Sequence, residues 1–204
     1  AVAEMYIKGV STRQAESVMR EFGIESLSST QVSRAAKLLD EELAAWRNRP
    51  LEQMKYLILD ARYEKARLDG VVRDVAVLSA IGVGLDERRH VLGLSVALCE
   101  AEVYWRAFLE NLQARGLRGT IFIVSDDHAG LKAARRAVLG AAIWQRCQFH
   151  LAQNAVHNSP NNDIRKRIGK QLRSVWNASS LAAAEAELAP LVSTYRDNLP
   201  DSAA

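Results

Sequence analysis

Apolar residues in the stretch that follows Ser28 recur three and four positions apart, which is the spacing of one buried face of a helix. Ser28 has a glutamine three positions later, and Ser11 further upstream has the same partner, which is the pattern of a capping box at a helix start. We therefore expect two helices within residues 1–46, joined in a helix-turn-helix-like pair. The apolar stripe of the second consists of Val32, Ala35, Ala36, Leu39 and Leu43.

Beyond Pro50 the pattern changes from helical to β-rich. Three strands are predicted first, with an Asp69-Gly70 turn between the first two, and helices and strands then alternate. The order βββαβαβα describes an α/β fold with a mixed sheet and helices on its faces, as in ribonuclease-H-like domains. The predicted strands are 55–67, 71–85, 90–98, 120–127 and 141–147, and the predicted helices are 101–116, 129–140 and 148–157.

Composition indicates the cellular compartment in which the protein works. The 204 residues carry a formal net charge of +3, and the two cysteines, Cys99 and Cys147, lie far apart in sequence. Such cysteines form no disulfide framework, so we expect a reducing compartment and a cytoplasmic protein. No apolar run approaches the roughly 18 residues of a membrane span, so we expect no membrane partner. The missing initiator Met and the abrupt end favour a fragment or a trimmed chain.

Two groups of polar residues are candidates for contact with nucleic acid. Thr30, Gln31, Arg34 and Lys37 lie at the start of the second helix, where they suit phosphates and base edges. A helical bundle that only packs is an equally good interpretation, because acidic and basic residues balance over 1–50. The second group follows the last predicted strand and is locally basic: Arg165, Lys166, Arg167 and Lys170.

A carboxylate follows an apolar run at two places. Asp60 ends "LILD" in the first predicted strand, where an unpaired buried charge is costly. A carboxylate in this position requires a metal cation or a basic side chain as a partner. A structural salt bridge with Arg62 or Lys65 is the simpler alternative. Asp126 repeats the pattern, because "TIFIV" runs through Ser125 into it.

The two aspartates would meet in a ribonuclease-H-like sheet, because its first and fourth strands are neighbours. Adjacent carboxylates repel unless a cation lies between them. Mg²⁺ and Mn²⁺ choose oxygen ligands and keep positions open for phosphate oxygens. Two such ions could activate a water or a 3′-hydroxyl and stabilise the leaving oxygen. Asp60 and Asp126 are therefore the candidate metal ligands and catalytic residues.

Two neighbouring features have a simpler interpretation. Asp127 is the alternative to Asp126 as a metal ligand, but we expect it to cap the following helix. We expect His128 to be exposed. Cys147 and His150 form a C-x-x-H pair, but zinc needs two further ligands and no partner spacing supplies them. A buried thiol and a polar residue at a helix start is the plain alternative.

The segments "YLILDARYEKAR", "VLGLSVALCEAEVYWRAFLENLQARGLRG", "VSDDHAGLKAA" and "WQRCQFHLAQNA" occur in this order. Together they resemble the Mutator-type transposases of bacterial insertion sequences, which are members of the DDE superfamily. "MYIKGVSTRQ" and "STQVSRAAKLLDEELAAWRNRPL" resemble the helical DNA-binding region ahead of the catalytic domain in those proteins. The resemblance covers nearly the whole chain.

The resemblance implies a DNA-binding module over 1–50, a ribonuclease-H-like catalytic core over 51–158 and the start of an all-α insertion over 159–204. Asp60 and Asp126 match the first two catalytic aspartates, and Cys147 with His150 matches a signature near the active site. Trp105 matches an aromatic position on the first core helix. Implied partners are Mg²⁺ or Mn²⁺ as a two-metal cofactor, terminal inverted repeats and target DNA, and further copies of the chain assembled on DNA.

The sequence departs from the family pattern at the third catalytic carboxylate, which is a glutamate in those proteins. No glutamate lies between Asp127 and Glu185. Asp163 looks like a loop residue and helix cap, and Glu185 and Glu187 look like solvated surface. We therefore expect the chain to stop inside the insertion, before the family glutamate.

Two functions remain open at this point. The first is phosphodiester cleavage and strand transfer in DNA transposition, weak or absent in these 204 residues alone because two carboxylates hold a second ion poorly. The second is a catalytically inactive DNA-binding remnant that regulates the intact transposase. A nuclease without transposition is disfavoured by the N-terminal helical module.

Overall fold

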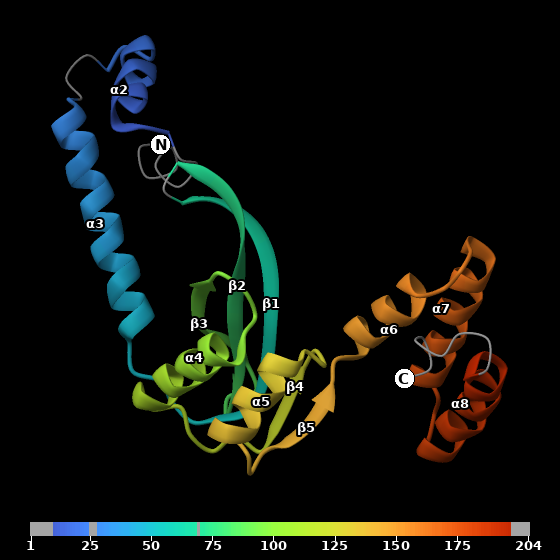
Figure 1. Cartoon of the computed structure of the whole chain (residues 1–204). Helices are drawn as coiled ribbons and strands as arrows, with labels where there is room; N and C mark the ends of the chain where they lie inside the picture. The colour runs from blue at the N-terminus through green and yellow to red at the C-terminus, as the bar shows by residue number, and fades with distance from the viewer. Residues whose placement is uncertain (1–9, 25–27, 69, 197–204) are drawn as a thin grey trace. The chain divides into compact units, whose positions relative to one another are not determined.

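The computed structural model describes residues 10–24, 28–68 and 70–196. Tertiary contacts divide the chain into two compact units (Figure 1). The first contains α2 (Thr12–Glu21) and α3 (Ser29–Asn48), and the second contains the sheet and the other described helices. None of the helices in the described part is long and apolar enough to cross a membrane.

The first unit confirms the two predicted helices and their starts. Ser11 and Ser28 each accept a backbone hydrogen bond at the N-terminus of their helix, and both capping boxes are complete. α2 and α3 contact one another, and the buried apolar residues of the pair are Ala15, Met19, Val32 and Ala36. The predicted connection between them falls partly on residues 25–27, outside the described range.

The second unit is built on a five-stranded mixed sheet with the order β3-β2-β1-β4-β5. β1, β2 and β3 pair antiparallel, and β4 and β5 run parallel to β1. This is the ribonuclease-H-like arrangement that the order of elements predicts. The strands are β1 (Met54–Leu68), β2 (Val71–Gly84), β3 (Arg89–Ala97), β4 (Phe122–Ser125) and β5 (Ile143–Arg146).

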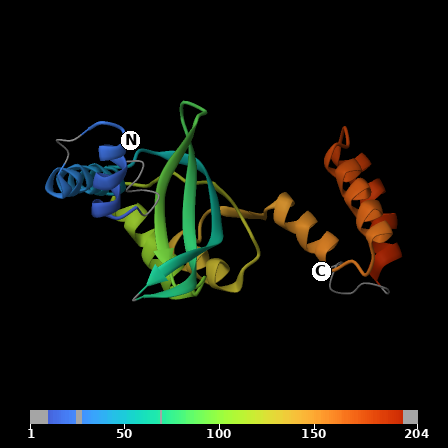
Figure 2. The same cartoon turned by 90° about the horizontal axis from the view of Figure 1, so that it is seen from above.

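β1 and β2 are the long strands of the sheet and lie side by side (Figure 2). Their ladder extends from Met54 opposite Gly84 to Leu68 opposite Val71. The predicted turn residue Asp69 lies outside the described range, while Gly70 next to it has a φ of 80°, which suits a tight turn. β4 pairs with β1 only over 56–59, so β1 continues past its parallel neighbour.

Two helices run side by side in the second unit: α4 (Glu102–Ala114) and α5 (Ala129–Val138). Their starts touch at Gly130, which lies against the backbone of Glu102, and their ends are joined by Gln113 Nε2 donating to the Val138 carbonyl at 3.1 Å. The helices bury Trp105, Phe108, Leu109, Leu112, Leu131 and Ala134, and the strands bury Leu57, Leu59, Leu78, Leu92 and Ile123. The alternation of buried and exposed positions leaves Tyr56, Ile58 and Asp60 on the other face of β1.

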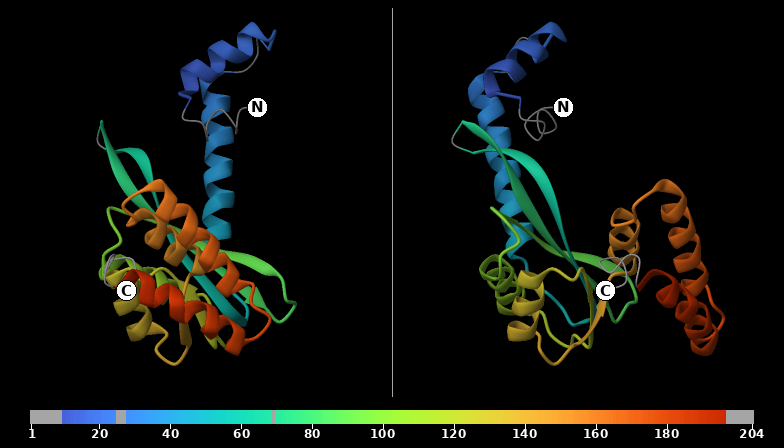
Figure 3. Two further views of the ribbon diagram at one scale, coloured as in Figure 1. Left: turned by 90° about the vertical axis from the view of Figure 1, so that its right-hand side faces the viewer. Right: turned by 45° about the vertical axis from the view of Figure 1, so that its right-hand side comes forward.

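Three further helices form a small core of their own: α6 (Gln148–His157), α7 (Asn162–Trp176) and α8 (Leu181–Arg196). They lie against one another in both views of Figure 3. Ala155 of α6, Ile168 and Leu172 of α7 and Tyr195 of α8 are buried together. By its packing α6 therefore belongs with α7 and α8, although it follows directly from β5.

Candidate active site

Asp60 and Asp126 both come directly after the last paired residues of β1 and β4, which are two neighbouring interior strands of the sheet. These strands run parallel, and their last paired residues are Leu59 and Ser125. Asp60 is the next residue of β1, and Asp126 directly follows the end of β4. Neighbouring strands are about 4.8 Å apart, so the backbone brings these two residues next to one another where the pairing ends. The predicted juxtaposition of the two aspartates follows from this pairing.

Asp60 is more exposed than its apolar context predicted. Its side chain is 49% exposed, so the expectation of a buried charge is wrong. Asp60 lies one residue beyond the last β4 pair and on the face of β1 away from Leu57 and Leu59, which explains the exposure. The salt-bridge alternative is also not seen, since Arg62 pairs with Glu64 and Lys65 with Asp74.

His150 contacts Asp60 from the first turn of α6. Its Nε2 lies 3.5 Å from Asp60 Oδ1, and its side chain is 22% exposed. The ring Nδ1 is buried and has no hydrogen-bond partner among the described residues. Cys147 is the N-cap of α6, and its own N–H donates to the Ser125 carbonyl at 2.7 Å. The C-x-x-H spacing thus joins the end of β4 to the Asp60 carboxylate.

The end of β4 is held in place by buried polar contacts. Ser125 is buried, accepts a hydrogen bond from Trp144 Nε1 at 2.9 Å and donates to the Asp126 carbonyl at 2.9 Å. Asp126 Oδ1 accepts the N–H of Asp127 at 2.7 Å, which fixes the carboxylate against its own backbone. This hydrogen bond uses Oδ1 and does not involve Oδ2.

Asp127 does not cap the helix, and that prediction is wrong. The N-cap of α5 is His128, which makes no side-chain capping bond. Asp127 instead lies between two cations, with Lys132 Nζ at 2.6 Å and Arg146 Nη1 at 3.8 Å. Two basic partners on α5 and β5 draw the carboxylate away from the helix start. Asp127 is therefore a structural ion-pair residue, in contrast to Asp126.

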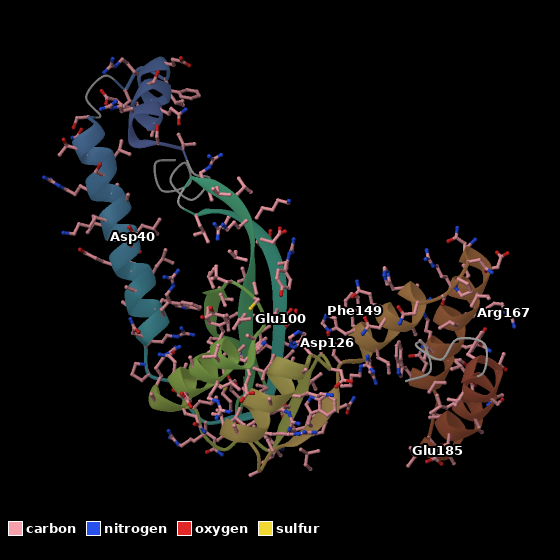
Figure 4. The ribbon with its side chains drawn as sticks, viewed as in Figure 1. Asp40, Glu100, Asp126, Phe149, Arg167 and Glu185 are labelled. Atoms are coloured by element: carbon pink, nitrogen blue, oxygen red, sulfur yellow. The ribbon has the colours of Figure 1, made fainter. Side chains whose placement is uncertain are left out.

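Glu100 is a member of the site that the sequence did not reveal. It lies in the connection between β3 and α4, and its side chain is 16% exposed. Burial raises the pKa of its carboxyl group, His128 lowers it, and the negative charges of Asp126 and Asp60 raise it further. Figure 4 labels Glu100 and Asp126 close to one another, partway along β1. An acid just before a helix is ordinary in sequence, so no local signal distinguishes Glu100.

The donor set of this site suits a hard divalent cation. Mg²⁺ usually binds proteins through one or two carboxylates and keeps several waters, and Asp60 and Asp126 provide two on adjacent strands. No three His, Cys, Asp or Glu side chains of the described residues are placed closely enough to hold a metal ion by themselves. The two aspartates therefore fit a cation that completes its shell with water or phosphate oxygens.

The candidate third carboxylates do not join the site. Asp163 lies in the first turn of α7, and the cap is Asn161, whose side chain accepts from the N–H groups of Asp163 and Ile164. The prediction that Asp163 caps this helix is therefore wrong by two positions. Glu185 and Glu187 are exposed on α8, as their sequence context predicted.

The candidate DNA-contacting residues are exposed on two helices. Thr30, Gln31, Arg34 and Lys37 lie on α3, where the Gln31 side chain already accepts the Ser28 N–H at 2.7 Å and Lys37 approaches Glu41 at 3.9 Å. Arg165, Lys166, Arg167 and Lys170 are exposed on α7. Lys166 and Lys170 are one turn apart and share a face of that helix.

Comparison with known proteins gives a consistent result. Residues 1–204 match the family model described as "Transposase, Mutator family". The chain is 57% identical over 187 residues to the transposase of insertion sequence element IS406 from Burkholderia multivorans, covering 91% of this chain and 48% of the relative. It is 41% identical over 200 residues to the ISRM5 transposase of Rhizobium meliloti, covering 98% and 50%.

The chain thus spans about half the length of the curated relatives it matches, at 48% and 50%. Among solved structures, the HTLV-2 integrase catalytic core in complex with magnesium aligns with 66% of this chain and 95% of its own, at 12% identity and a TM-score of 0.30. A score this low carries no weight beside the strand order.

Proposed function

Since the chain belongs to the Mutator family of transposases, we propose that it carries the cation-dependent DNA-cleavage site of an insertion-sequence transposase. The reaction is hydrolysis of a phosphodiester bond at the element end, followed by attack of the freed 3′-hydroxyl on target DNA. The observation that supports it most is that Asp60 and Asp126 directly follow Leu59 and Ser125, the last paired residues of the adjacent parallel strands β1 and β4.

The residues of the site have distinct roles in this proposal. Asp60 and Asp126 hold Mg²⁺ or Mn²⁺, which supplies Lewis-acid activation of the phosphodiester and of the attacking oxygen. His150, at 3.5 Å from Asp60 Oδ1, orients that carboxylate. The open face of β1 on which Asp60 lies gives the DNA backbone access to both aspartates. Cys147, the N-cap of α6, contributes through its backbone, whose N–H donates to the Ser125 carbonyl and so holds the start of the helix that carries His150.

DNA contacts outside the site are assigned to α3 and α7. Thr30, Gln31, Arg34 and Lys37 meet the terminal inverted repeats, and Arg165, Lys166, Arg167 and Lys170 meet phosphates. Both sets are exposed, and a basic helix surface favours the phosphate backbone. The protein is expected to work in the cytoplasm on nucleoid DNA and to assemble there with further copies of itself.

A strand-cleavage assay tests the proposed reaction. Linear DNA bearing the inverted repeats that flank the gene is incubated with the chain and Mg²⁺ or Mn²⁺. We expect weak cation-dependent nicking at the repeat end, abolished by Asp60→Ala. Robust cleavage that survives Asp60→Ala would contradict the assignment. DNA binding without nicking would favour the regulatory remnant.

Neutralising the exposed lysines of α7 should weaken DNA binding at every sequence. Each phosphate contact contributes about one unit to the slope of log K against log salt, so the double variant Lys166→Ala/Lys170→Ala is expected to reduce that slope by about two. Fluorescence anisotropy at several salt concentrations measures it. Arg106→Ala is the control, because Arg106 is already paired with Glu102 and its loss should leave the slope unchanged. An unchanged slope in the double variant would remove α7 from the DNA interface.

A further inference from the structure

Glu100 has no part in the proposed chemistry, yet it lies in an unusual place for a carboxylate. Only 16% of its side chain is exposed, and its basic neighbour is His128, with Nδ1 at 4.0 Å from Oε2. Asp60 and Asp126 both act on Glu100 as like charges. A half-buried carboxylate beside two others is unfavourable unless positive charge compensates it.

The backbone around Glu100 is fixed against the helix that follows Asp126. Gly130 of α5 packs so closely that a Cβ there would lie 2.3 Å from the Glu100 carbonyl oxygen and 2.9 Å from the Glu102 nitrogen. This contact leaves no room for a side chain at position 130. It holds the β3–α4 connection against the start of α5, which follows β4. The positions of Glu100 and Asp126 relative to one another are therefore fixed.

The buried indole N–H of Trp105 is directed toward the Glu100 carboxylate. Trp105 is 0% exposed, and its Nε1 has no completed hydrogen bond among the described residues. Its neighbouring carboxylate is that of Glu100, and the N–H lowers the pKa of that group. Buried Trp N–H groups normally find a partner, so an unpartnered one aimed at a carboxylate marks a position prepared for negative charge.

We propose that Glu100 is a supporting carboxylate of the divalent-cation site, which strengthens cation binding at Asp60 and Asp126 from the β3–α4 connection. This inference rests on the proposed function. Because no three side chains of the described part are close enough for direct ligation, Glu100 acts from outside the ligand shell, through its charge and through hydrogen bonds from surrounding water. The 204 residues then present three carboxylates to one cation.

Mn²⁺ titration of the 204-residue chain tests the inference, with free Mn²⁺ followed by electron paramagnetic resonance. Glu100→Gln keeps the shape and removes the charge, and we expect about a 10-fold weaker Kd, because loss of an outer-shell partner typically costs about 10- to 100-fold in metal affinity. Glu102→Gln is the matched control. It is two residues away, is paired with Arg106, and should bind Mn²⁺ like the wild type.

Thermal denaturation separates a cation-site role from a purely structural one. In EDTA, Glu100→Gln should raise the Tm, because a partly desolvated charge and its repulsion from two aspartates are removed. On addition of Mn²⁺, the rise in Tm should be smaller for the variant than for the wild type. A residue that only braces the fold would instead lower the Tm in EDTA and leave the Mn²⁺ response intact.

The outcomes distinguish this inference from the proposed function. Wild-type Mn²⁺ affinity in Glu100→Gln, together with lost affinity in Asp126→Asn, overturns the role of Glu100 and leaves the cation site standing. Wild-type affinity in both variants, or no saturable Mn²⁺ binding by the wild type, overturns the cation site and the inference together.

Discussion

Replacing Asp126 with asparagine is expected to abolish saturable Mn²⁺ binding, with a loss in affinity of at least about 100-fold, since even outer-shell changes cost about 10- to 100-fold. The fold should be unaffected, because the asparagine oxygen can still accept the Asp127 N–H that Asp126 Oδ1 accepts at 2.7 Å. Isothermal titration calorimetry measures the affinity, and the Tm in EDTA reports the fold.

Asp127→Asn is the matched control for this prediction, because it removes the same charge one residue later. Asp127 is paired with Lys132 at 2.6 Å and Arg146 at 3.8 Å, so its loss leaves two cations without a partner. We expect a lower Tm for this variant and a much smaller loss of Mn²⁺ affinity than for Asp126→Asn. If Asp127→Asn lost Mn²⁺ affinity and Asp126→Asn kept it, the cation ligand would be Asp127 and not Asp126.

Adding a methyl group at Gly130 is expected to destabilise the protein by roughly 1–3 kcal/mol, the usual cost of overpacking. The new Cβ would lie 2.3 Å from the Glu100 carbonyl oxygen, and backbone atoms cannot turn aside as a flexible side chain can. The β3–α4 connection must therefore move away from α5. Because Glu100 moves with it, Gly130→Ala should also weaken Mn²⁺ binding.

Gly169→Ala provides the comparison within the same chain. Gly169 is also in a helix, α7, and the nearest atom to a Cβ there is Val156 Cγ2 at 4.0 Å, an ordinary contact. Alanine should therefore stabilise this position by about 0.5–1 kcal/mol, from its better helix propensity. Urea denaturation of both variants gives the two free energies of unfolding. Equal effects of the two substitutions would show that the close packing at Gly130 is not a constraint.

Much of the fold could be predicted because local patterns decide it. Strand and helix positions follow from apolar periodicity and turn residues, and the five strands and α4, α5 and α6 appear within a few residues of their predicted bounds. Periodicity tells which side of an element is buried but not which strand is its neighbour. The pairing of β1 with β4 was predicted from the order of elements, and the structure confirms it.

The site was predictable only where it depends on that pairing. Asp60 and Asp126 follow apolar runs on neighbouring strands, so their juxtaposition could be inferred. The ion pairs of Asp127 with Lys132 and Arg146 could not, because cap preferences are alike for neighbouring polar residues and the deciding partners lie on α5 and β5.

Glu100 was missed for a related reason. Glu100 stands out through residues distant in sequence: His128 lies 4.0 Å from its carboxylate, and the charges of Asp126 and Asp60 raise its pKa. In sequence it is one of two acids around the start of α4, and Glu102, the first residue of that helix, pairs with Arg106. Burial separates the two, because the Glu100 side chain is 16% exposed and the Glu102 side chain is 44% exposed.

Localised cleavage by bound Fe²⁺ tests the central claim, a divalent-cation site between β1 and β4, most directly. Fe²⁺ that replaces Mg²⁺ generates hydroxyl radicals with ascorbate and peroxide, and these cut the backbone next to the metal. Mass spectrometry of the fragments should show cuts clustered around Asp60, Asp126 and Glu100, suppressed by excess Mg²⁺. Cuts clustered elsewhere, for instance at the exposed Asp86 and His90 pair, or cuts that Mg²⁺ does not suppress, would contradict it.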